Sequence, residues 1–302
     1  MRFCRAASGR RLKGRSNMQT VFSAIMGIVQ GLTEFLPVSS SGHLLVAEKL
    51  LGLLGYQTES NALAMGVMLH MGTLIAVAVI FWKDWVDMLL HPVKNRTLLM
   101  LFIASIPALI LVLLLGDRID MLFEGWFLGI SFLVTACFLV LIERLSGGKG
   151  RHSQGKDEVR LPQAITMGLF QGIALLPGVS RSGSTLLGGV ASGLSRKTAA
   201  KFSFMMSAPA ILGSFVMEAK DAMEQGGLSS LINTQALVGM AFAGVSGFLA
   251  IRYMLKLIER ISFYKFALYV LAVGIAVIIM QLTGFAGFPP IAFPAAAIVP
   301  AG

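Results

Sequence analysis

Four side chains suited to acid–base or anion chemistry lie in two Ser/Gly-rich segments of a largely apolar chain. Glu34, Ser40 and His43 belong to the first segment, and Arg181 belongs to the second. A serine near a histidine can act as a nucleophile with its base, or the histidine can protonate a leaving group. A guanidinium matches phosphate oxygens with paired hydrogen bonds. These residue types indicate a site that binds an anion, typically a phosphate, and reacts with it.

The two segments repeat each other at a spacing of 141 residues. Six residues of the first segment have identical counterparts 141 positions later: Gly27, Gln30, Gly31, Ser39, Ser41 and Gly42. Each copy reads as an apolar half-helix, a proline break and a Ser/Gly-rich start to a second helix. Only the first copy has Glu34 and His43, and only the second has Arg181, so both copies are needed to complete one site.

The start of the second helix in each copy can bind an anion. Ser39 and Ser180 are natural N-caps, and the amides of the next turn have no acceptor within the helix. Gly42 and Gly183 would let a ligand approach the backbone closely. Two such helix starts facing each other in a membrane form an anion site, because their amides and dipoles both attract negative charge. The expected binding residues are Thr33, Ser39, Ser41, Gly42, Ser180, Ser182 and Gly183.

Glu34 follows Gln30 by one helical turn within an apolar stretch. Its carboxylate can serve as a general base, as a metal ligand or as the partner of Arg181. A purely structural ion pair between Arg181 and Glu34 is the alternative to a catalytic role. His70 lies alone on an apolar span, where packing is the expected role, and Lys201 is expected to be an ordinary loop charge.

The composition indicates a membrane protein. Of the 302 residues, 56% are hydrophobic and 13% are charged, and the mean hydropathy is +0.78, which is too apolar for a soluble domain of this length. Two cysteines, Cys4 and Cys137, argue against a disulfide framework or a cysteine metal site. The net charge of +10 includes six bases within residues 1–17, so it does not indicate binding to nucleic acid.

Ten apolar segments predict an all-α polytopic membrane protein. Six are long enough to cross a bilayer: 63–82, 97–116, 125–143, 198–217, 234–254 and 264–283. Four are too short to cross alone and read as two re-entrant helical hairpins: 20–36 with 40–53, and 161–176 with 182–194. The chain therefore repeats one unit, a hairpin followed by three spans, which gives six full spans in total.

An odd number of spans in each unit requires the second unit to lie upside down relative to the first, as an inverted-topology repeat. Lys and Arg concentrate in four loops: 83–96, 144–160, 195–201 and 252–265. The positive-inside rule places these loops in the cytoplasm, so the first hairpin opens to the outer face. The expected organisation is a basic extension, disordered or not translated, before one membrane domain: 1–17, then 18–302, with repeat 1 at about 20–145, a linker at 146–160 and repeat 2 at about 161–283.

The two segments also resemble known motifs. Residues 30–43, Gln-Gly-Leu-Thr-Glu-Phe-Leu-Pro-Val-Ser-Ser-Ser-Gly-His, and 177–185, Pro-Gly-Val-Ser-Arg-Ser-Gly-Ser-Thr, are similar to the two signatures of the undecaprenyl-diphosphate phosphatase, or bacitracin-resistance, family. The resemblance runs from about residue 20 to residue 283. It implies the inverted-repeat fold and a hydrolase that removes the terminal phosphate of undecaprenyl diphosphate. That reaction recycles the lipid carrier for peptidoglycan synthesis and confers bacitracin resistance.

The resemblance implies roles for single residues as well. Glu34, His43 and Arg181 correspond to residues that the family needs for activity, and Ser40 corresponds to a serine proposed as nucleophile. A divalent cation, Mg²⁺ or Ca²⁺, is implied, with Glu34 and Gln30 as its candidate ligands. The family has Glu or Gln at position 30, and the Gln found here weakens any scheme in which two carboxylates hold the ion.

The sequence predicts phosphoryl transfer from a polyprenyl diphosphate whose tail stays among the membrane lipids. Ser40 could attack with His43 as its base, or His43 or Glu34 could activate water, and the sequence leaves these routes open. The resemblance and the loop charges favour a multi-pass protein of the bacterial cytoplasmic membrane with its site open to the outer face. The alternative is a transporter or flippase of polyprenyl phosphate or another anion, which would use Arg181 but has no need of a histidine beside a serine.

Overall fold

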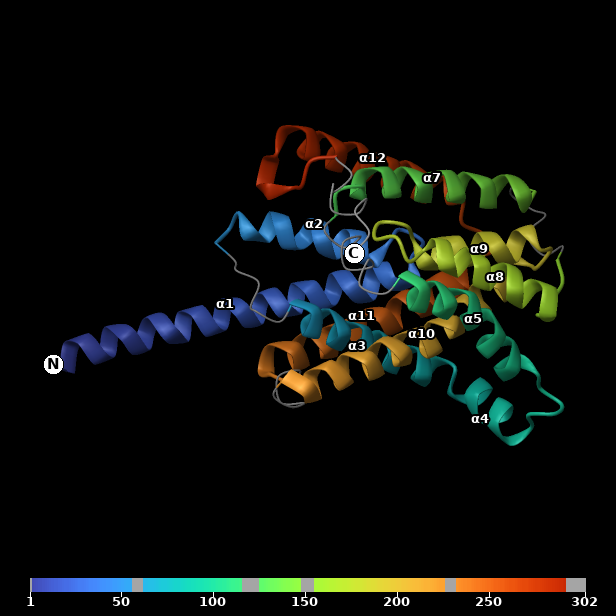
Figure 1. Ribbon diagram of the computed structural model, residues 1–302, viewed down its shortest axis with the longest axis horizontal. Coiled ribbons are helices and arrows are strands. Elements are labelled where there is room, and N and C mark those ends of the chain that lie inside the picture. Colours follow the sequence, from blue (N-terminus) through green and yellow to red (C-terminus); the bar gives the residue numbers. More distant parts are fainter. Residues whose placement is uncertain (1, 56–61, 116–124, 148–154, 226–231, 292–302) are drawn as a thin grey trace, which may run out of the picture.

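The computed structural model describes residues 2–55, 62–115, 125–147, 155–225 and 232–291, and within these ranges the chain forms helices joined by turns (Figure 1). Five of the helices are long and apolar enough to cross a membrane, and a bent helix pair can count as a sixth span. The prediction of an all-α polytopic membrane protein is therefore confirmed.

The element order of the first half of the chain recurs in the second half. The first half holds α1 (Arg2–Phe35), α2 (Ser40–Gly52), α3 (Ala62–Ile80), α4 (Trp82–Leu90), α5 (Thr97–Leu115) and α7 (Leu128–Leu145). The second half holds α8 (Leu161–Ile173), α9 (Arg181–Ala191), α10 (Arg196–Gln225), α11 (Thr234–Leu257), α12 (Phe263–Thr283) and the short turn η2 (Phe285–Gly287). In each half, a helix pair broken at a tip precedes three long helices, as the sequence predicts.

The two broken helix pairs point at each other. The chain turns at residues 36–39 between α1 and α2, and at residues 174–180 between α8 and α9. From these tips, α1 and α2 run toward one end of the molecule, whereas α8 and α9 run toward the opposite end (Figure 1). Opposed hairpins are what an inverted-topology repeat requires. The inverted repeat itself, and the re-entrant course of each hairpin in a bilayer, stay predictions.

Two helices extend beyond their expected limits. Helix α1 begins at Arg2, so residues 2–17, expected as a disordered or untranslated extension, continue the first half-helix as part of one long helix. In Figure 1 this part of α1 projects beyond the other helices. Translation from Met18 stays a prediction. Helix α10 continues to Gln225, past the expected end at residue 217, so its last turns extend beyond the apolar run.

Helix α4 lies where the sequence predicts a loop. It meets α3 at a bend of 72°, and its Met88 side chain is buried. Asp84 of α4 pairs with Lys201 of α10, with Nζ 2.5 Å from Oδ1. Lys201, expected as an ordinary loop charge, therefore connects two helices.

The glycines that recur in the two motifs allow helices to pack closely. A Cβ atom on Gly27 or Gly31 would overlap backbone oxygens of α11, and a Cβ atom on Gly168 would overlap the Ala104 carbonyl of α5. Small residues are the usual means by which membrane helices approach each other, because lipid supplies no hydrophobic force between them. Helix α1 thus packs against α11 and helix α8 against α5, which fixes the two tips relative to the long helices.

A buried ion pair holds together the ends of several helices. Arg196, expected as a cytoplasmic loop charge, is 1% exposed, and its Nη2 donates to Glu143 Oε2 of α7 at 3.0 Å. The remaining donors bind Ser146 Oγ at 2.7 Å and the Ile261 carbonyl at 3.1 Å. The guanidinium also lies 4.8 Å from the centre of the Phe263 ring. These long-range partners of Arg196 cannot be read from the local sequence, and its cytoplasmic placement stays a prediction.

We expect Arg196→Met to lower the free energy of unfolding by about 3–5 kcal/mol, because the Glu143 carboxylate would stay buried without its partner. Chemical or thermal unfolding of the purified protein in detergent measures this change. Lys197→Met is the matched control, since Lys197 is the next residue and is exposed. Equal stability of Arg196→Met and Lys197→Met would contradict the assignment.

Candidate active site

Each tip ends in a serine that caps the following helix. Ser39 Oγ accepts a hydrogen bond from the Gly42 amide at 3.3 Å, and Ser180 Oγ accepts one from the Gly183 amide at 3.1 Å. Both serines are therefore N-caps, as expected. The first tip is strained, because Ser39 has a φ of 75°, a value that non-glycine residues rarely adopt. In the second tip the residue with a positive φ, of 90°, is Gly178.

The two tips bind each other through serines that were expected to bind the anion. Ser41 Oγ of the first hairpin accepts a hydrogen bond from the Gly178 amide at 3.4 Å. Ser182 Oγ of the second hairpin donates to the Leu36 carbonyl at 3.1 Å. These contacts are reciprocal, since each hairpin offers one hydroxyl to the turn of the other. They bring the starts of α2 and α9 together.

Some predicted binding residues take other partners. Gly42 and Gly183 are buried, and a Cβ atom on Gly42 would overlap the Phe132 ring. Gly42 therefore permits close packing of the Phe132 ring, and the approach of a ligand to its backbone stays a prediction. Thr33 Oγ1 donates to the Val29 carbonyl of its own helix at 2.6 Å, so its hydroxyl is already engaged.

Glu34 is the centre of the site. Its Oε1 accepts a hydrogen bond from Arg181 Nη2 at 2.7 Å, which joins the first hairpin to the second. Its Oε2 accepts from Ser40 Oγ at 2.6 Å and from Gln30 Nε2 at 3.1 Å. The side chain of Glu34 is 4% exposed and that of Arg181 is 19% exposed. Four residues singled out in the sequence thus meet at one carboxylate.

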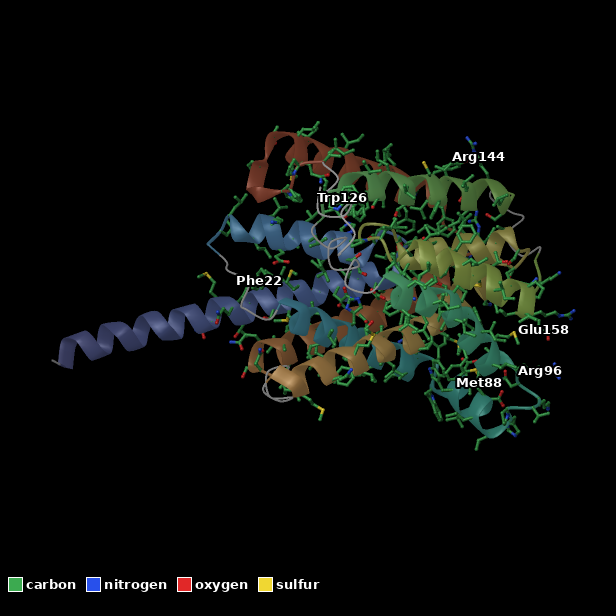
Figure 2. The ribbon with its side chains drawn as sticks, viewed as in Figure 1. Phe22, Met88, Arg96, Trp126, Arg144 and Glu158 are labelled. Atoms are coloured by element: carbon green, nitrogen blue, oxygen red, sulfur yellow. The ribbon has the colours of Figure 1, made fainter. Side chains whose placement is uncertain are left out.

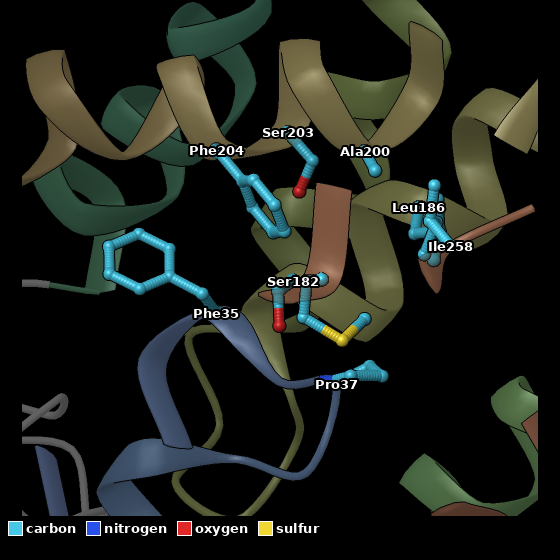
Figure 3. A pocket seen from close by; sticks show the side chains of 9 residues that line it. Phe35, Pro37, Ser182, Leu186, Ala200, Ser203, Phe204 and Ile258 are labelled. Atoms are coloured by element: carbon cyan, nitrogen blue, oxygen red, sulfur yellow. The ribbon is translucent and has the colours of Figure 1, made fainter. Parts of the chain in front are cut away.

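Arg181 is fixed by a second contact. Its Nη1 donates to the Ser203 carbonyl of α10 at 3.3 Å, and the Ser203 and Thr185 hydroxyl oxygens are 2.6 Å apart. A small, mainly apolar pocket lies beside these residues, lined by the first tip, α9, α10 and the end of α11 (Figure 3). Ser182 and Ser203 are its polar lining residues. The guanidinium therefore has a defined orientation beside Glu34.

His43 lies between the first tip and α12. Its Nδ1 lies 2.7 Å from the Ser39 carbonyl oxygen, so Nδ1 carries a proton, because a carbonyl only accepts. Its Nε2 lies 2.9 Å from the Tyr269 hydroxyl of α12, and the two rings stack with centroids 5.7 Å apart. Phe132 meets the imidazole edge-on.

The hydrogen bond that a nucleophile–base pair of Ser40 and His43 would need is absent, since both imidazole nitrogens are engaged elsewhere and the Ser40 hydroxyl donates to Glu34. Helical spacing correctly placed Ser40 and His43 one turn apart, but the direction of the imidazole depends on Tyr269. Within the described residues, the arrangement makes Glu34 the base that can take the Ser40 proton.

Two contacts at the site were missed in the sequence. Tyr269 carries no local signal, since it lies 226 residues from His43 on an apolar span. His70 was expected to pack, but its Nε2 lies 3.8 Å from Glu34 Oε2 and its Nδ1 lies 2.8 Å from the Gly66 carbonyl. A histidine within an apolar span was the available signal for His70.

Comparison with known proteins gives one consistent result. The family described as "Bacitracin resistance protein BacA" matches residues 23–276. An undecaprenyl-diphosphatase of Halothermothrix orenii is 38% identical over 263 residues, which cover 86% of this chain and 98% of the relative. Undecaprenyl-diphosphatase 4 of Bacillus thuringiensis (strain Al Hakam) is 36% identical over 260 residues, or 86% and 96% of the two chains.

A third relative, an undecaprenyl-diphosphatase of Carboxydothermus hydrogenoformans, is 36% identical over 269 residues, which are 88% of this chain and 99% of the relative. The family match, residues 23–276, includes both tips and all the residues that meet at Glu34. The chain belongs to the bacitracin resistance protein BacA family.

Proposed function

We propose that this protein hydrolyses undecaprenyl diphosphate to undecaprenyl phosphate and inorganic phosphate. The hydrogen bond of 2.6 Å from Ser40 to Glu34, formed beside Arg181 where two helix starts meet, is the observation that carries the proposal. The relatives named undecaprenyl-diphosphatase support this substrate. The reaction recycles the lipid carrier for cell-wall synthesis, and resistance to bacitracin fits the family description.

The substrate headgroup binds at the joined tips, and its polyprenyl tail stays in the lipid. The capping serines take the Gly42 and Gly183 amides, and the first-turn amides before them, which have no acceptor within their helices, attract phosphate oxygens. Arg181 adds a guanidinium, which binds phosphate through paired hydrogen bonds. Its ion pair with Glu34 lets one side chain hold the substrate and orient the base at the same time.

The reaction begins when Ser40 Oγ attacks the terminal phosphorus and Glu34 Oε2 takes the hydroxyl proton. The bond from phosphorus to the bridging oxygen breaks, and undecaprenyl phosphate leaves while Arg181 stabilises the charge on the transferring group. His43 could act on the leaving oxygen only through Nε2, the nitrogen that contacts the Tyr269 hydroxyl, because Nδ1 is bonded to the Ser39 carbonyl. Water then releases phosphate from Ser40, and the proton on Glu34 restores the hydroxyl.

The residues at Glu34 fit a divalent cation such as Mg²⁺ or Ca²⁺. Among the described residues no group of three or more His, Cys, Asp and Glu could hold a metal ion. However, Mg²⁺ commonly binds to one or two carboxylates and to substrate phosphates. Glu34 supplies a carboxylate, and Gln30 Oε1 is a buried oxygen without a hydrogen-bond partner in the described part of the chain. A bound cation would neutralise charge on the diphosphate.

The contact between Ser40 and Glu34 favours hydrolysis over transport. A transporter or flippase of polyprenyl phosphate would need Arg181 and the helix starts to bind its cargo. It would not need a hydroxyl hydrogen-bonded to a buried carboxylate, because moving an anion forms and breaks no covalent bond. Hydrolysis therefore accounts for more of the contacts in the site than transport does.

The multi-pass protein resides in the bacterial cytoplasmic membrane with its site open to the outer face. Arg96 and Arg144 lie at the end of the molecule where α8 begins, together with Glu158 of the linker (Figure 2). The excess of Lys and Arg in the loops 83–96 and 144–160 supports a cytoplasmic position for this end. The hairpin of α1 and α2 opens at the opposite end, which is where a lipid diphosphate on the outer leaflet would enter.

Phosphate release from undecaprenyl diphosphate in detergent with Mg²⁺ tests the activity. We expect Arg181→Lys and Glu34→Gln each to lower kcat/KM at least about 100-fold, since each removes a charged hydrogen bond at the reacting group. Arg160→Lys is the matched control, because Arg160 is an exposed arginine paired with Glu158, and it should stay within about twofold of wild type. An Arg181→Lys protein that folds and keeps full activity would refute the assignment of this active site.

Acid quenching during turnover of substrate labelled at the terminal phosphate distinguishes a phosphoserine intermediate from direct attack by water. We expect labelled protein with the phosphate on Ser40, and no label in Ser40→Ala, because the hydroxyl is already hydrogen-bonded to its base. Ser214→Ala, at an exposed position of α10, should label as wild type does. Efficient turnover by Ser40→Ala would show instead that Glu34 activates water directly.

Single cysteines in a protein with Cys4 and Cys137 replaced by serine test the orientation. We expect Leu54→Cys, exposed after α2, to react with a membrane-impermeant maleimide in intact cells. Glu158→Cys, in the exposed linker, should react only after the membrane is permeabilised. The reverse pattern would place the site on the cytoplasmic face.

A further inference from the structure

We propose that helix α4 lies in the surface of the membrane and binds phospholipids, with its exposed apolar face among the acyl chains and the neighbouring basic side chains at the headgroup phosphates. This surface lies outside the active site, and the proposal does not depend on the proposed reaction. It turns the segment 83–96, which the sequence predicts to be a loop, into a binding surface whose partner is phospholipid.

The bend between α3 and α4 limits how deep α4 can lie. Helix α3 has 19 residues, so it is about 28 Å long and nearly crosses a hydrocarbon core of about 30 Å by itself. Helix α4 leaves α3 at an angle of 72°. The 9 residues of α4 therefore advance only about 4 Å along the direction of α3. Helix α4 thus begins where α3 reaches the membrane surface, and it runs along that surface.

Exposed apolar side chains occupy one face of α4. They follow the spacing i, i+4, i+7 and i+8, which places them in a single stripe along a helix: Trp82, Val86, Leu89 and Leu90. Between 42% and 69% of each of these residues is exposed. A tryptophan beside leucines and a valine is typical of a helix whose apolar face enters the boundary between headgroups and acyl chains.

The other faces of α4 are turned toward the protein and toward water. Met88 is 1% exposed and Asp84 pairs with Lys201 of α10, so this side of the helix packs on the protein. Asp87 is exposed and accepts hydrogen bonds from two residues that follow α4. It lies about 160° from Leu89 around the helix axis. The contacts at Met88 and Asp84 fix the rotation of the helix, so the apolar stripe and Asp87 face opposite environments.

Basic side chains border the apolar stripe. Lys83 precedes Leu90 by seven residues, so the two lie at the same edge of the stripe. Lys94 and Arg96 follow in the turn that leads to α5 (Figure 2). All three basic residues are exposed, and none forms an ion pair within the described part of the chain. The long stems of such side chains cover apolar surface while their charged ends reach phosphate groups.

The position of the stripe favours lipid over a second protein as its partner. The helices on either side of α4 also expose large apolar side chains, as expected of membrane spans: Ile75 and Val79 of α3, and Leu99 and Phe102 of α5. The stripe therefore continues a lipid-facing surface at the edge of the molecule (Figure 1). Four partly exposed side chains also offer much less than the about 800 Å² that each partner buries in a typical stable protein interface.

Spin labelling of the full-length protein in vesicles of phosphatidylglycerol and phosphatidylcholine tests the proposal. Leu89→Cys and Asp87→Cys, each in a protein with Cys4 and Cys137 replaced by serine, place a nitroxide on opposite faces of α4. Oxygen concentrates in lipid, whereas a nickel chelate stays in water. We expect the ratio of oxygen to nickel accessibility to be at least about fivefold higher at position 89 than at position 87, because only position 89 lies among acyl chains.

Asp87→Cys is the matched control, since it lies two residues away on the same helix and is also exposed. High nickel accessibility at both positions would mean that α4 lies in water, and high oxygen accessibility at both would place it inside the hydrocarbon as part of a broken span. A label at position 89 that neither reagent reaches would show that protein covers the stripe. Each of these three results would overturn the proposal, and none of them depends on turnover.

Discussion

The structure depends on a single carboxylate that must be compensated in an apolar environment. A buried charge is tolerated in a membrane only when it is paired and hydrogen-bonded, since no water is present to solvate it. Glu34 meets this requirement through Arg181, which lies 147 residues later in the other half of the chain. The two hairpins therefore have to end at the same depth, and the reciprocal contacts of Ser41 and Ser182 hold them there.

The tips also show how irregular backbone is accommodated inside a membrane protein. Backbone groups at membrane depth must find partners within the protein. Here the two turns find them in each other and in α7. Thr135 of α7 accepts from the Ser180 amide and donates to the Gly178 carbonyl. The strained φ of Ser39 persists because these surrounding contacts leave the turn no alternative.

Much of this arrangement follows from the sequence, and what does not follow has a common cause. Apolar run length, proline breaks and N-cap serines predict the helices and both tips, and the unequal repeats predict that Glu34 meets Arg181. The orientation of His43 and the partner of Ser40 were not predictable, because Tyr269 arrives from a distant helix that carries no motif. The partners of Arg196 on α7 and at Ile261 are distant in sequence in the same way. Periodicity identifies which residues share a face, but only tertiary packing determines which atoms meet.

The distance in sequence between Glu34 and Arg181 has a consequence for how the protein is made. Ribosomes add about 5–20 residues per second, so the 147 residues that separate the two side chains take roughly 7–30 s to synthesise. During that interval the first hairpin has its carboxylate but not its counter-ion. The nascent hairpin must then remain in contact with water or lose its charge, and it can settle into lipid only after the second half of the chain has followed.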